Sequence, residues 1–171
     1  MNTVKVVARI LFYVTRVLSA LYFAFALHSA FALTTGLSLK LREGSKYFAV
    51  NIPFTQQAYL LGDYNLPYIL FDFLLPLAGY GLFFLLVSNI FKAFFQPRLF
   101  TDYGVTQLQR FYIANFILPG LALVLASFFT VVDDIAWVLV VLHFILAVFS
   151  YFMAAIFRQG LHLQTQQDLI I

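Results

Sequence analysis

Three side chains that can carry a proton or bind a metal interrupt long apolar runs of this sequence. They are His28, Asp72 and His143. A polar or ionisable group is costly in such surroundings unless it is paired, so each position is a candidate functional site. Counted from the predicted helix ends at about 1.5 Å per residue, they lie roughly 7, 9 and 12 Å deep. All three can therefore share one layer near the same end of the helices.

That predicted layer is compatible with three kinds of chemistry and with one structural role. A carboxylate beside histidines could relay protons or hold an ion. His28 and His143 could ligate a haem iron as a pair, and the same pair with Asp72 could bind a divalent metal. Hydrogen bonds to neighbouring helices would satisfy these groups without any chemistry. We favour the structural role, because two histidines are few, and we expect neither a cofactor nor a metal.

Signals for other chemistry are missing from the sequence. There is no cysteine, no Walker glycine loop, no dinucleotide fingerprint, no nucleophile elbow and no HExxH motif. The basic residues lack a nucleic-acid-binding arrangement. Asn89 and Asn115 could form a second polar layer near the other end, for which an interhelical hydrogen bond is the simplest role. We therefore predict that the chain is not an enzyme and does not bind nucleic acid directly.

The elements that must position these residues are membrane helices. Of the 171 residues, 63% are hydrophobic and 10% are charged, whereas a soluble domain carries about 25% charged residues. A bilayer crossing needs about 20 apolar residues, and four runs meet that length. We predict an all-α membrane protein, one domain over residues 1–171, with a four-helix transmembrane bundle. The predicted helices cover about 10–33, 66–91, 111–132 and 135–157.

The loop charges predict the orientation of these helices. Seven basic residues fall on one side of the predicted membrane: Lys5, Arg9, Arg16, Lys92, Arg98, Arg110 and Arg158. The positive-inside rule places that side in the cytoplasm, so both termini, the loop 92–110 and the tail 158–171 are predicted to be cytoplasmic. The expected location is the plasma (inner) membrane, with the loop 34–65 outside.

Local signals refine the connections between the helices. Residues 38–42 alternate in polarity, residues 43–45 can turn the chain, and residues 47–52 read as a second strand, which predicts a small outer β-hairpin between helices 1 and 2. Thr101 is a good N-cap, so helix three should begin there. Asp133 and Asp134 predict a tight turn between the last two helices, since paired carboxylates avoid lipid. Pro76 and Pro119 are expected to kink their helices.

Two segments carry a resemblance to a known family. The first runs from Pro97 to Thr101 and continues with Leu108 and Arg110. The second reads Ile-Phe-Arg-Gln-Gly-Leu-His-Leu-Gln-Thr-Gln-Gln-Asp-Leu-Ile-Ile over residues 156–171. Both resemble the bacterial four-span membrane proteins of the domain-of-unknown-function 2975 family. That family typically has glutamate where Gln166 stands and threonine where Ile170 stands, so this tail has one charge fewer.

The resemblance implies a partner rather than a reaction. Members of the family have no established activity and are often encoded beside small helix-turn-helix regulators of the Cro/CI type. This implies that the chain anchors or controls a cytoplasmic transcription regulator. A small transporter or proton pathway, and a haem-binding redox protein, are the alternatives, and a homo-oligomer is compatible with any of them. The residues expected to bind the partner lie in the inner loop and tail: Phe100, Thr101, Arg110, Arg158, Leu161, Leu163, Asp168 and Leu169.

Overall fold

Four long helices dominate the computed structural model, which describes residues 2–37, 39–42, 44 and 46–168. They are α1 (Asn2–Thr35), α2 (Leu75–Phe94), α3 (Asp102–Ser127) and α4 (Asp134–Asp168). A π-helix, η1 (Tyr68–Leu74), leads directly into α2. Each of the four spans, with η1 counted as part of α2, is long and apolar enough to cross a membrane. These spans indicate a multi-pass membrane protein.

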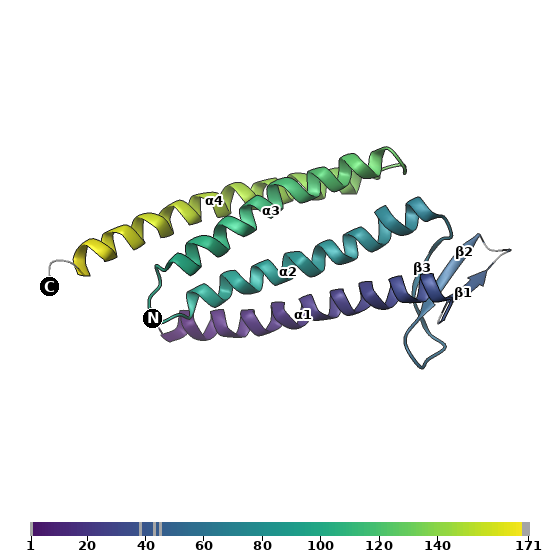
Figure 1. Cartoon of the computed structure of the whole chain (residues 1–171), viewed down its shortest axis with the longest axis horizontal. Coiled ribbons are helices and arrows are strands. Elements are labelled where there is room, and N and C mark those ends of the chain that lie inside the picture. The colour runs from purple at the N-terminus through teal and green to yellow at the C-terminus, as the bar shows by residue number, and fades with distance from the viewer. Residues whose placement is uncertain (1, 38, 43, 45, 169–171) are drawn as a thin grey trace.

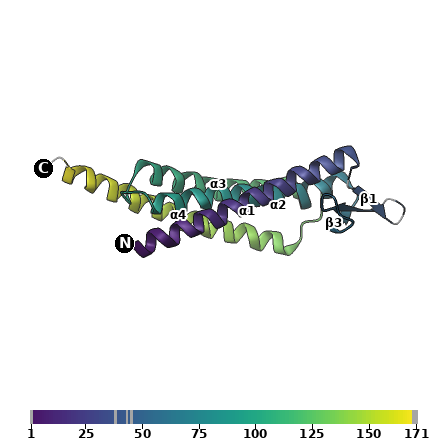
Figure 2. The same ribbon diagram turned by 90° about the horizontal axis from the view of Figure 1, so that it is seen from below.

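The two ends of the molecule differ in what they carry (Figure 1). Both termini and the α2–α3 loop lie at one end, which we call the termini end, and the β-sheet and the α3–α4 turn lie at the other, the sheet end. In both views α4 reaches beyond the other helices at the termini end (Figure 2). The termini end therefore presents a loop and a protruding helix, whereas the sheet end presents β-structure.

The helices pack as two antiparallel hairpins. α1 packs along α2, α3 packs along α4, and α2 joins the hairpins through a smaller contact with α3. α1 and α4 lie at opposite edges (Figure 1), so the arrangement is more open than the predicted four-helix bundle. Small side chains let the α1 and α2 backbones approach closely. The buried residues of α1 among those described are Ala8, Thr15, Ser19, Ala26, Ser29 and Ala32.

The second span is not a continuous α-helix, as the sequence predicted over 66–91. Residues 68–74 form the π-helix, in which the Leu75 N–H donates to the Leu70 carbonyl five residues earlier. Pro76 follows at the start of α2. Because proline has no N–H to donate, its first-turn position leaves no α-helical hydrogen bond unmade. Pro76 thus lies where the π-helix changes to the α-helix, rather than inside an α-helix.

The last two helices confirm one boundary and correct two others. α3 begins at Asp102, and the Thr101 side chain accepts a hydrogen bond from the Gly104 N–H, as predicted. α3 ends at Ser127 rather than 132, so residues 128–133 form a longer connection than the predicted Asp-Asp turn. α4 continues to Asp168 rather than ending at 157. The predicted polar tail is thus mostly helix, because Phe157 and Leu161 pack into an apolar cluster that carries the helix onward.

The predicted outer hairpin is instead a three-stranded antiparallel sheet of β1 (Leu39–Arg42), β2 (Tyr47–Asn51) and β3 (Ala58–Asp63). In the chain the strands follow α1, but in space the sheet lies beyond the end of α1 and not in the space between helices 1 and 2 (Figure 1). Part of the predicted turn, Glu43 and Ser45, falls outside the described residues. The third strand completes a sheet that two strands alone would leave marginal.

One face of the sheet packs against the helix ends. Phe48 and Val50 of β2 are fully buried in a cluster with Ala32 of α1 and Ile69 of η1. Gly62 of β3 pairs with Phe48 and lies under the Tyr68 ring, where a β-carbon would come within 2.5 Å of the ring. The sheet is therefore fixed to the helices at a position that accommodates no side chain.

A Gly62→Ala substitution should destabilise this junction. The added methyl group must push away Tyr68, and such overpacking costs about 1–3 kcal/mol. We expect a lower thermal unfolding midpoint of the purified protein in detergent. Gly79→Ala is the matched control, because its β-carbon would meet nothing within 4 Å. An equal midpoint for both variants would contradict the tight packing of β3 on η1.

Candidate functional site

The three residues of the predicted polar layer are not brought together. His28 contacts the sheet, Asp72 contacts the α3–α4 turn, and His143 contacts α3. Within the part of the chain that the structure describes, no group of three or more His, Cys, Asp or Glu residues could hold a metal ion. The shared layer is therefore corrected to three separate sites, because the sequence does not reveal how far each helix is shifted along its neighbours.

His143 belongs to a polar pair between α3 and α4. Its Nδ1 lies 2.6 Å from the Asn115 Oδ1, and the Asn115 Nδ2 donates to the Phe111 carbonyl at 2.8 Å. Since an amide oxygen only accepts, the imidazole proton lies on Nδ1. The Phe83 ring meets the imidazole edge to face at 5.4 Å between centroids. Asn115 was expected in a layer with Asn89, but its partner is His143.

His28 lies under the sheet at the end of α1. Its Nε2 donates to the Asn51 backbone carbonyl at 3.2 Å, which fixes the imidazole against β2. The neighbouring Ser29 hydroxyl shares a hydrogen bond of 2.7 Å with the Tyr59 hydroxyl of β3. Burial raises the pKa of the Tyr59 phenol, and the Ser29 hydrogen bond offsets only part of this effect. These groups join α1 to two strands and are all engaged by protein partners.

Asp72 lies level with the α3–α4 turn rather than with His143. Its carboxylate accepts a hydrogen bond from the Thr130 hydroxyl at 3.5 Å, and its side chain is exposed. His143 lies nine residues into α4, about 13 Å farther along the helix axis at 1.5 Å per residue. The predicted haem, metal and proton-relay arrangements of these three residues therefore have no common site in this structure.

Another candidate surface lies at the termini end, where the α2–α3 loop meets the last turns of α4. Phe100 packs on the Phe157 ring at 5.4 Å between centroids, and Gly160 provides the space for it. A β-carbon at Gly160 would come within 2.7 Å of the Phe100 ring. Arg98 donates to Asp168 at 2.8 Å across the same junction. The loop is thus attached to α4 by an aromatic contact and one exposed ion pair.

A shallow groove of about 210 Å³ runs along this junction. We call it the terminal groove. Its walls combine three charged residues, two of which form the Arg98–Asp168 ion pair, with polar and apolar side chains. It is lined by Arg98, Phe100, Thr101, Asp102, Leu161, Gln164, Thr165 and Asp168.

Four of the residues predicted to bind a partner meet in the terminal groove: Phe100, Thr101, Leu161 and Asp168. Arg110, Arg158 and Leu163 are exposed but do not line it, and Leu169 lies outside the described residues. Sequence reasoning missed Arg98, Asp102, Gln164 and Thr165 as lining residues. The spacing of Leu161, Gln164, Thr165 and Asp168 at three, four and seven residues would have indicated one helix face, had the tail been predicted as helix.

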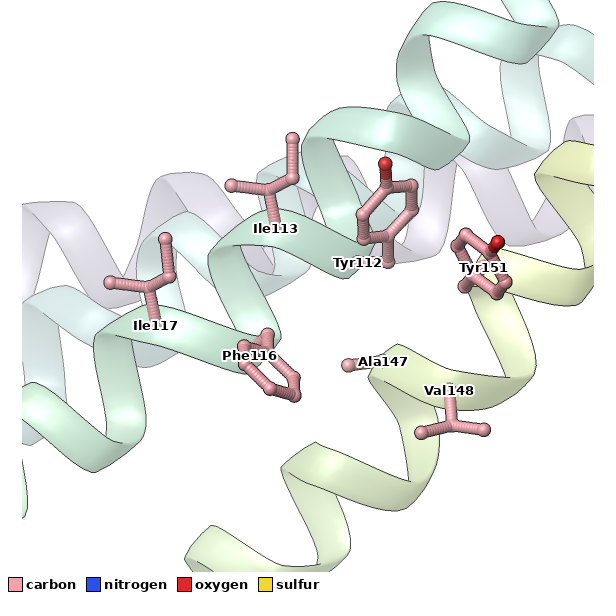
Figure 3. Close-up of a pocket in the computed structure, with 7 residues that line it drawn as sticks. All are labelled: Tyr112, Ile113, Phe116, Ile117, Ala147, Val148 and Tyr151. Atoms are coloured by element: carbon pink, nitrogen blue, oxygen red, sulfur yellow. The ribbon is translucent and has the colours of Figure 1, made fainter.

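A second hollow lies within the predicted membrane region on the outer side of α3 and α4 (Figure 3). Its volume is about 280 Å³. Figure 3 shows that all its walls come from these two helices, with two tyrosines near one end. It is lined by Tyr112, Ile113, Phe116, Ile117, Ala147, Val148 and Tyr151. The walls of this hollow expose apolar surface only.

The His143–Asn115 pair should couple α3 to α4 energetically. A double-mutant cycle of Asn115→Ala and His143→Ala should give a coupling of about 0.6–1.7 kcal/mol, the range of interhelical hydrogen bonds in membranes. Unfolding of the detergent-solubilised protein measures it. The cycle of Asn89→Ala with His143→Ala is the control, and it should be additive. Additivity in the Asn115 cycle would refute the interhelical bond.

The geometry thus offers one terminal groove, one isolated polar pair and one apolar hollow, each built from residues of this chain alone. No protein family, curated protein or solved structure matches the chain.

Proposed function

We propose that this chain is a membrane-embedded interaction protein that docks a soluble regulator at its terminal groove. The observation that supports this most strongly is that the groove is preformed. Thr101 caps the N-terminus of α3 at the end of the loop, and Phe100 packs on Gly160. The Arg98–Asp168 ion pair joins the same loop to α4. A rigid surface loses little conformational entropy when a partner binds to it.

The length of α4 supports placing this groove in water. With 35 residues, α4 is about 52 Å long at 1.5 Å per residue. The hydrocarbon core of a bilayer is about 30 Å thick, so the last turns extend beyond it. The terminal groove is built from those turns, where a soluble partner has access.

The charge distribution supports a cytoplasmic location for the termini end. This end holds seven of the ten basic residues and only two of the seven acidic residues, Asp102 and Asp168. The positive-inside rule then places both termini in the cytoplasm and the sheet outside, in a plasma (inner) membrane. A cytoplasmic groove can bind only a cytoplasmic partner.

The class of partner rests on the family resemblance of residues 97–110 and 156–171. A helix-turn-helix regulator of the Cro/CI type is the proposed partner, held at the membrane away from DNA. The transporter alternative depends on His28, Asp72 and His143 acting together, and the haem alternative depends on the two histidines. These three residues have separate partners. The terminal groove is therefore the better candidate for the function.

The proposed orientation can be tested with single cysteines, because the chain contains none. Gln57→Cys at the sheet end should react with a membrane-impermeant maleimide on intact spheroplasts. Gln159→Cys at the termini end should react only after permeabilisation. Both positions are exposed, so a difference in labelling reports the side of the membrane. The reverse labelling pattern would overturn the orientation.

Docking can be tested with a charge placed in the groove. Gln164→Arg should abolish co-purification of a helix-turn-helix regulator from host-cell membranes, since it adds a large cation to the groove wall. Gln159→Arg is the matched control, because it makes the same change on the same helix outside the groove. The control should retain the regulator. Loss in both variants, or retention in both, would rule out the terminal groove as the docking surface.

A further inference from the structure

Several cations at the termini end have no ion-pair partner among the residues that the structure describes. Arg9 and Arg16 of α1, Lys92 of α2 and Arg110 of α3 all have exposed side chains. Among the residues that the structure describes, the one salt bridge joins Arg98 to Asp168. None of the four therefore has a carboxylate within 4 Å in that part of the chain. Uncompensated positive charge close to lipid attracts an anion.

Contacts between the helices gather three of these cations around Tyr103. The Arg16 guanidinium donates to the Ser88 hydroxyl at 3.3 Å, and Lys92 follows Ser88 by one turn of α2. The Lys92 ammonium lies 5.7 Å from the centre of the Tyr103 ring. Arg110 lies two helical turns after Tyr103 on α3, so the two side chains share one face of that helix. Residues from α1, α2 and α3 thus converge on one side chain.

Two aromatic rings make cation–π contacts with the guanidinium groups of α1. Arg9 lies 5.7 Å from the Phe95 ring centre and Arg16 lies 5.8 Å from that of Phe12. The two rings contact each other edge to face at 5.5 Å between centroids. Cation–π contacts orient a guanidinium without using its hydrogen-bond donors. The Arg9 donors, and those Arg16 donors that do not bond to Ser88, therefore stay available for an acceptor from outside.

A buried polar atom lies on the same face of α3. Gln107 is one turn after Tyr103 and three residues before Arg110, so the three share a helix face. Its side chain is 5% exposed, and its Oε1 has no hydrogen-bond partner within the described residues. A buried acceptor without a donor is costly. A ligand with a hydroxyl group, or water carried with it, would supply the missing donor.

The depth of the cluster matches a lipid headgroup rather than a solute in open water. Ser88 lies six residues before the end of α2, about 9 Å, and Arg110 lies eight residues after the start of α3, about 12 Å. The cations thus reach below the helix ends, between the headgroup and the acyl chains. Basic pockets between transmembrane helices hold anionic headgroups in this way.

We propose that Arg16, Lys92 and Arg110, gathered around Tyr103, bind the phosphate of an anionic phosphoglycerol lipid. Phosphate oxygens accept from the three cations, and headgroup hydroxyls offer the donor that Gln107 lacks. Asp102, the acidic residue nearest in the chain, lines the terminal groove on the α4 side of the α3 N-terminus. This site does not depend on the proposed regulator, because none of its residues lines the terminal groove.

The test is lipid retention by the purified full chain in native mass spectrometry. With added phosphatidylglycerol or phosphatidylcholine, the wild type should retain the anionic lipid preferentially. Lys92→Gln and Arg110→Gln should each weaken that retention about fivefold, the order expected for one basic residue at an anionic headgroup. Lys92→Arg should restore it, because the charge is kept.

Arg158→Gln is the matched control, since it removes one exposed cation from the same end but from α4. It should retain the lipid as the wild type does. If Arg158→Gln and Lys92→Gln lost lipid retention equally, the retention would reflect general surface charge, and the proposed site would be refuted. Displacement of the lipid by millimolar inorganic phosphate would show a site for free anions instead. No preference over phosphatidylcholine would also refute the proposal.

Discussion

Lipid offers no hydrogen-bond partner to a polar side chain, and this constraint explains where the polar atoms of the four helices lie. The Thr15 hydroxyl donates to the Leu11 carbonyl of its own helix, and the Ser19 hydroxyl donates to the Gly81 carbonyl of α2. Asn115 and His143 satisfy each other across α3 and α4. Each partner is within the protein. The same need selects small hydroxyl and alanine side chains for the α1–α2 contact, because they bond locally and allow close approach.

Contacts at the two ends of the molecule fix the sheet and the α2–α3 loop to the helices. At the sheet end, Phe48 and Val50 pack against α1 and η1, so β2 bridges the first helix and the start of the second. At the termini end, Phe100 fills the space above Gly160 and connects the α2–α3 loop to α4. Between these ends α2 and α3 make a smaller contact. The sheet therefore joins the two helices of the first hairpin, whereas the Phe100 contact joins the first hairpin to the second.

The N-terminus of α3 links the two proposed binding surfaces. Thr101 and Asp102 line the terminal groove toward α4, and Tyr103 lies among cations contributed by α1 and α2. Three consecutive residues thus contribute to the terminal groove and to the proposed lipid site. The Thr101 cap holds this first turn in place.

The sequence by itself determined the features that follow from local chemistry. Four apolar runs predicted four spans, Thr101 predicted the start of α3, and the loop charges distinguished the two ends of the molecule. These signals depend on bilayer thickness, on one capping oxygen and on net charge, all of which can be read along the chain. The alternating strand pattern likewise predicted β1 and β2, because each strand shows its own period.

Only the tertiary structure decided which distant residues meet. Counting depth within each helix made one shared layer of His28, Asp72 and His143 seem possible. How far each helix is shifted along its neighbours, however, is set by packing between the helices. β3 went unpredicted because Ala58–Asp63 lacks a clear alternation and acquires its strand from pairing with β2. The tail became helix because Phe100 packs against Gly160 and Phe157, a contact between segments about 60 residues apart in the chain. Such contacts depend on shape complementarity between elements, which no single stretch of sequence contains.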